Sequence, residues 1–84
     1  MHVTARERVL LMALLDHDSG LTLKELAQAA SVSVRTIQRD LPTLERTASG
    51  FQLTLKKGHV LSLEGHKEAK ETLRSNCQEK SILI

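Results

Sequence analysis

A pair of helical patterns separated by only three residues is the feature that most constrains how this chain can fold. Both patterns repeat apolar residues at spacings of three and four, which places those residues on one face of a helix. The residues on the two apolar faces are Leu23, Leu26, Ala27 and Ala30 in the first pattern and Val34, Ile37, Leu41 and Leu44 in the second. The patterns are separated by Ser31, Val32 and Ser33. Ser33 is a favourable N-cap for the helix of the second pattern. We therefore predict two amphipathic helices that pack across a tight turn.

The outer side of the helix that begins after Ser33, the third helix of the chain, carries the side chains that point to a function. Arg35, Thr36, Gln38 and Arg39 lie there, close to the start of the helix at Ser33. An α-helix fits the major groove of B-DNA, and residues near its N-terminus reach the base edges. Either arginine could make two hydrogen bonds to a guanine or bind a phosphate. Gln38 could bind an adenine or a phosphate oxygen, and Ser33 and Thr36 could bind a phosphate. The pattern predicts a helix-turn-helix that binds double-stranded DNA, and it leaves open which arginine reads a base.

After Phe51 the apolar period changes from helical to two, which predicts a β-hairpin. The expected cross-strand pairs are Leu53 with Leu63 and Leu55 with Leu61. This register places Gly58 at the centre of the turn, as a short hairpin needs. The tip carries three further candidate DNA contacts, Lys56, Lys57 and His59. Because an isolated hairpin is marginally stable, we expect it to dock on the helices as a wing whose tip holds the flanking backbone or the minor groove.

Two capping boxes mark the starts of the first two helices. They are the segments Thr4–Glu7 and Thr22–Glu25, and the first helix is expected to run to about Asp16. Pro42 lies well inside the third helix. Since proline removes a backbone hydrogen bond, we expect it to kink or end the regular helix near Leu41.

The chain after Gly65 is helical in pattern and very polar, with a thin apolar stripe made of Ala69, Leu73 and Cys77. The last three residues, 82–84, are apolar, and we expect this helix to continue into, or pack on, a further domain. The predicted fold is α+β and mainly α: a winged helix-turn-helix with a three-helix core, a C-terminal two-stranded β-hairpin wing and then a C-terminal helix. Residues 1–65 are assigned to the DNA-binding domain, and residues 66–84 to a C-terminal helix or linker toward a missing regulatory domain.

Composition argues against several classes of protein. The only aromatic residue is Phe51, whereas modules that read single-stranded nucleic acid stack bases on aromatic side chains. With one cysteine and four scattered histidines, we expect no intramolecular disulfide and no metal site. Glycine loops that cradle phosphates, and nucleophiles with a partner histidine, are missing from the sequence, so we expect no enzyme and no cofactor. We also expect no membrane association and a cytoplasmic location.

The positive charge of the chain gathers in one segment. Residues 33–60 hold five basic and two acidic residues, whereas the rest of the chain holds seven basic and eight acidic ones. Such a distribution is typical of a patch that faces phosphates, although a solvated surface would produce it too.

Each assignment has a simpler alternative. In the alternative for Arg39, this residue binds no DNA and only pairs with Asp40 or Glu45. In the alternative for Lys56 and Lys57, the two lysines only protect an edge strand from pairing with another chain. Arg46 follows the proline and is interpreted as a surface residue. Asp40 is expected in an internal ion pair or hydrogen bond. A second functional hypothesis is a winged-helix module that binds another protein. That module would favour apolar residues on the outer side of the third helix, where this chain has arginine, threonine and glutamine.

The segments that carry these motifs resemble a known family. The residues at 23–27 (LKELA) and 32–41 (VSVRTIQRDL) are similar to the helix-turn-helix of bacterial DeoR-type regulators. The segments 50–53 (GFQL), 57–58 (KG) and 61–65 (LSLEG) extend the resemblance to the N-terminal domain of transcriptional activators that carry phosphotransferase-system (PTS) regulation domains, such as the mannitol-operon activators. Ser31, where many such proteins have glycine, and Pro42 depart from the pattern.

The resemblance implies a multidomain bacterial regulator of a sugar-uptake operon. It places phosphorylatable histidines in domains outside this chain, so none of the four histidines here inherits that role. Regulators of this kind bind two half-sites as dimers, and the resemblance implies a homodimer formed through domains that are absent here.

Overall fold

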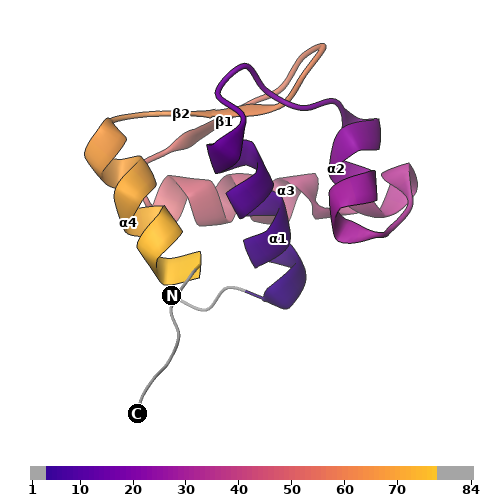
Figure 1. Ribbon diagram of the computed structural model, residues 1–84, viewed down its shortest axis with the longest axis horizontal. Helices are drawn as coiled ribbons and strands as arrows, with labels where there is room; N and C mark the ends of the chain where they lie inside the picture. Colours follow the sequence, from indigo (N-terminus) through magenta and orange to yellow (C-terminus); the bar gives the residue numbers. More distant parts are fainter. Residues whose placement is uncertain (1–3, 78–84) are drawn as a thin grey trace.

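The computed structural model describes residues 4–77, and these form a winged helix-turn-helix (Figure 1). The elements in chain order are α1 (Ala5–Asp16), α2 (Leu23–Ala30), α3 (Val34–Gly50), β1 (Thr54–Lys56), β2 (Ser62–Glu64) and α4 (Lys67–Cys77). In Figure 1, α1 lies in the centre with α2 and α4 on opposite sides, and α3 crosses behind it. The predicted fold class, with a helical core, a two-stranded hairpin and a final helix, is confirmed.

The first three helices begin at the predicted caps. In α1 the Thr4 hydroxyl accepts from the Glu7 N–H at 3.1 Å, while the Glu7 carboxylate accepts from the Thr4 N–H at 2.9 Å. Thr22 and Glu25 make the same reciprocal pair at the start of α2. These bonds satisfy amide groups that have no partner inside the helix, so both capping boxes are confirmed.

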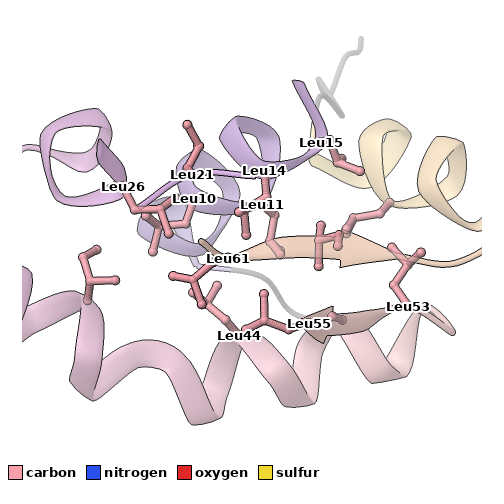
Figure 2. Packing of buried hydrophobic residues seen from close by; sticks show 14 of the residues in the cluster. Leu10, Leu11, Leu14, Leu15, Leu21, Leu26, Leu44, Leu53, Leu55 and Leu61 are labelled. Atoms are coloured by element: carbon pink, nitrogen blue, oxygen red, sulfur yellow. The ribbon is translucent and has the colours of Figure 1, made fainter. Parts of the chain in front are cut away.

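One core, made mostly of leucines, holds the elements together. Figure 2 shows leucines from α1, α2, α3 and the hairpin converging on one core. The residues with no exposed surface in this core include Leu10, Leu11, Leu26, Ile37, Leu44 and Leu73. α1 contacts α2, α4 and β2. Because it has several neighbours, apolar residues occupy more than one face of this helix.

Ser31 makes the tight turn between α2 and α3 in a left-handed conformation, with φ 57° and ψ 43°. The Val32 N–H then donates back to the Ala27 carbonyl at 2.9 Å, so the last turn of α2 is closed while the chain reverses. Left-handed backbone is strained for a residue with a side chain, which is why glycine is common at such positions. Ser31 adopts the conformation that glycine would supply.

α3 runs without a break from Val34 to Gly50, with Pro42 inside it. The expected end of the regular helix near Leu41 is therefore wrong, while the alternative expectation of a kink at Pro42 stays a prediction. Pro42 lies on the exposed side, whereas Leu44 and Ala48 beyond it are completely buried. Burial of these two residues stabilises the second half of the helix against the loss of one backbone hydrogen bond.

The hairpin has a different register from the predicted one. Leu55 lies opposite Leu63, Thr54 opposite Glu64 and Lys56 opposite Ser62, so the predicted pairs are wrong by two residues. Leu61 instead exchanges two backbone hydrogen bonds with Leu21, at 2.8 and 2.7 Å. A shift of two residues keeps every side chain on its face of the hairpin, so the hairpin leucines are still buried.

The bridge to Leu21 also changes the turn. The connection between the strands spans residues 57–61, and Gly58 is its second residue rather than its centre. Gly20, by contrast, is required beside the bridge. It has φ 95°, and a Cβ added there would lie 2.8 Å from Cγ2 of Val60 and 2.9 Å from the Leu61 carbonyl oxygen.

α4 buries the predicted stripe against α1: Leu73 and Cys77 are buried and Ala69 is half-buried. Burial raises the pKa of the Cys77 thiol, which keeps this side chain neutral as a packing residue. The expectation about the apolar residues 82–84 lies outside the described residues. No helix within residues 4–77 is long and apolar enough to cross a membrane, and this part of the chain gathers no cluster of metal-binding side chains.

Candidate nucleic-acid interface

The N-terminal half of α3 displays the predicted side chains on the surface of the molecule. Arg35, Gln38 and Arg39 are exposed and Thr36 is half-buried, while Ile37, on the opposite side of the helix, has no exposed surface. Packing of Ile37 therefore orients the helix so that its arginines point outward. The candidate residues of the helix, Ser33 included, lie together at its start.

Ser33 caps α3 as predicted. Its hydroxyl accepts from the Thr36 N–H at 3.2 Å and lies 3.1 Å from the Thr36 hydroxyl. Both residues thus take part in the cap, and both keep hydroxyl groups at the helix start. Free amide groups and the positive end of the helix dipole favour an anion at this position.

Both carboxylates of α3 are neutralised by cations from other elements. Asp40 accepts from the Arg6 guanidinium of α1 at 2.6 and 3.2 Å, which confirms the expected internal ion pair. Glu45 accepts from the Lys57 ammonium of the wing at 3.1 Å. The negative charges on this helix are thereby compensated from its two flanks.

The three arginines of α3 are partnered differently from its two carboxylates. Within residues 4–77, neither Arg35, Arg39 nor Arg46 takes part in an ion pair, so the alternative in which Arg39 pairs with Asp40 or Glu45 is not the arrangement adopted. The outer surface of α3 therefore presents three uncompensated guanidinium groups. A face of this kind attracts polyanions.

The wing lies beside the same helix. β1 packs against α3, and the pair between Lys57 and Glu45 holds the base of the wing loop next to the middle of α3. Lys56 lies 3.6 Å from the Glu64 carboxylate of the facing strand, and His59 is exposed near the tip. The structure thus places Lys57 beside α3 at Glu45, while the predicted contacts of α3 itself lie nearer the start of the helix.

Sequence reasoning did not assign Arg6 to this region. Arg6 is 34 residues from Asp40 in the chain. The sequence pattern placed it only within the capping-box segment Thr4–Glu7, which says nothing about a contact with α3. Periodicity describes which side of a helix is buried, but it does not say which charged residues of two helices will meet. Arg46 was interpreted as a surface residue because it follows the expected kink at Pro42, whereas α3 is helical through Pro42 and beyond Arg46.

Comparison with protein families agrees with this geometry. A family model described as a helix-turn-helix (HTH) domain matches residues 6–65, from the first turn of α1 to the end of the hairpin. The matched range contains every residue discussed above as part of the interface. Searches of curated proteins and of solved structures found no significant match.

Proposed function

The chain belongs to the HTH domain family, whose fold binds DNA, and we propose that it is the sequence-specific DNA-binding domain of a bacterial transcription regulator. In this proposal α3 is the recognition helix and the hairpin is a wing that contacts the flanking backbone or minor groove. Double-stranded DNA is the partner, and no cofactor or catalytic step is involved.

One observation carries the proposal. The acidic residues of α3 are paired with Arg6 and Lys57, while the arginines of the same helix have no carboxylate partner among the described residues. Neither Asp40 nor Glu45 lies three or four residues from an arginine of α3, so no pairing along the helix competes for the guanidinium groups. Here the pairing leaves guanidinium groups free on the side that faces away from the core, as phosphate and guanine recognition requires.

The finer part of the proposal is the kind of regulator. The resemblance of about residues 4–75 to DeoR-type regulators and to activators with PTS regulation domains supports control of a sugar-uptake operon from the cytoplasm. A homodimer, assembled through domains outside this chain, would place two copies of α3 on two half-sites.

A protein-binding winged helix is the second candidate, and one feature favours it. Val9 on α1 is a large apolar side chain with 43% of its surface exposed. Val9 belongs to α1 and the arginines belong to α3, so the two activities would use different elements.

The decisive experiment is selection of duplexes from a random pool, followed by titration of the selected duplex and a scrambled duplex at two salt concentrations. We expect the selected duplex to bind more tightly at both. The double variant Arg35→Ala/Arg39→Ala should lose this preference, with Lys67→Ala/Lys70→Ala on α4 as the control of equal charge. Equal binding of both duplexes, abolished by salt, would contradict sequence-specific recognition.

A further inference from the structure

We infer that Arg46 binds a DNA phosphate at the edge of the major groove, and so extends the interface into the half of α3 that follows Pro42. The inference rests on the proposed function and deepens it by assigning a contact that fixes the position of the recognition helix on the duplex. It depends on the continuity of α3, which the sequence did not predict.

The first step is the direction of the side chain. Because α3 is helical from Val34 to Gly50, residues eleven apart are separated by about three full turns and face the same way. Arg46 is eleven residues after Arg35, and Arg39 lies between them near the same line. All three are exposed, so one stripe of guanidinium groups runs along the outer face of the helix.

The second step is the charge around Arg46. Its neighbour Glu45 accepts from Lys57 at 3.1 Å, and within residues 4–77 Arg46 has no ion pair of its own. The adjacent negative charge is therefore already engaged. An anion that approaches this turn of α3 meets an uncompensated guanidinium group.

The third step is reach. A rise of 1.5 Å per residue puts Arg35 and Arg46 about 16 Å apart along the helix axis, whereas the major groove of B-DNA is about 12 Å wide. When the start of α3 contacts base edges, Arg46 lies beyond the floor of the groove. The group it meets at that distance is the phosphate backbone, which guanidinium binds through paired hydrogen bonds.

The contact has a distinct signature. A phosphate contact carries no sequence information, so its loss weakens binding to all duplexes by the same factor and lowers the salt dependence by about one unit of slope. A base contact instead changes the preference among sequences. Loss of a charge far from the DNA lowers the affinity and the salt slope much less, because salt screens its interaction with the phosphates.

The test titrates the selected duplex and its single-base variants with the wild-type chain, Arg46→Ala, Arg46→Lys and the charge-matched control Lys67→Ala. We expect Arg46→Ala to weaken every duplex about tenfold and to reduce the salt slope by about one. Arg46→Lys should recover most of the slope, since it keeps the charge, and Lys67→Ala should change little. Thermal melts would show that the exposed substitutions leave the fold intact.

Two results would overturn the inference while leaving the proposed function in place. In one, Arg46→Ala binds like Lys67→Ala although the wild-type chain selects its duplex normally. In the other, Arg46→Ala alters the ranking of single-base variants, which would make Arg46 a base contact. Failure of the wild-type chain to prefer any duplex would instead overturn the proposed function, and this inference with it.

Discussion

The cations of α3 and the cations of the wing differ in how they are partnered. Arg35, Arg39 and Arg46 make no ion pair within the described part of the chain, whereas Lys56 and Lys57 each lie against a glutamate. When DNA binds, an arginine of α3 gains a new partner outright. A wing lysine exchanges a carboxylate for a phosphate, so its net contribution is smaller. Equal formal charge therefore does not mean equal contribution to binding.

The two regions also differ in how firmly they are held. α3 is fixed by Ile37 and Leu44, both without exposed surface, and by the pair of Asp40 with Arg6. The wing loop is exposed from Lys57 to His59, and a Cβ added at Gly58 would have no atom within 4 Å. A rigidly held side chain can discriminate between bases, while a loosely held one suits phosphates. We therefore expect α3 to supply specificity and the wing to supply general affinity.

The largest predicted effect separates these roles directly. Arg39→Ala should weaken the selected duplex by about 1–3 kcal/mol, because it removes an unpaired guanidinium from the rigid helix. Lys57→Ala should cost less than about 1 kcal/mol, because the exposed pair with Glu45 already offsets part of its charge. Fluorescence anisotropy titrations at one salt concentration would measure both. Equal losses for the two variants would remove the distinction between helix and wing.

Local sequence patterns predicted much of this arrangement. The capping boxes at Thr4 and Thr22, the cap at Ser33 and the apolar face of α3 depend on residues at most a few turns apart, and all of them are found in the structure. The exposure of Arg35 and Arg39 follows from the same period, because the side of the helix opposite Ile37 must face solvent.

Contacts between distant segments were not predictable in this way. The hairpin register depends on Leu61 pairing with Leu21, 40 residues earlier, which no alternation within the hairpin reveals. The continuity of α3 through Pro42 depends on tertiary burial of Leu44 and Ala48, which exceeds the local preference to stop. The partners of Asp40 and Glu45 are set by how the elements pack, so the unpaired state of the arginines emerged only from the structure.

A smaller effect is expected at the α1 flank of the recognition helix. Arg6→Met removes the partner of Asp40, so an uncompensated carboxylate would lie beside the DNA-binding face. A unit charge about 6 Å from a phosphate in water costs about 0.7 kcal/mol, so affinity should fall about threefold. The double variant Arg6→Met/Asp40→Asn should restore it. If both variants bound equally weakly, Arg6 would contact DNA itself rather than shield Asp40.

The smallest effect tests whether partnering, rather than position, limits the wing. Glu45→Gln releases Lys57 and removes a negative charge from the surface of α3, so affinity for any duplex should rise about twofold at low salt. The gain should vanish at high salt, where exposed charges are screened. Stability should change by less than about 1 kcal/mol, since the pair is half exposed.

A double-mutant cycle separates the two causes of that gain. In the Lys57→Ala background, Glu45→Gln still removes a repulsive charge but releases no lysine, so its benefit should shrink. An undiminished benefit would show that Glu45 acts only by repelling DNA, and that Lys57 contributes nothing once released. A diminished benefit would mean that the ion pair with Glu45 keeps Lys57 from binding DNA in the free protein. The difference in partnering between the wing and the recognition helix would then have a measurable effect on DNA affinity.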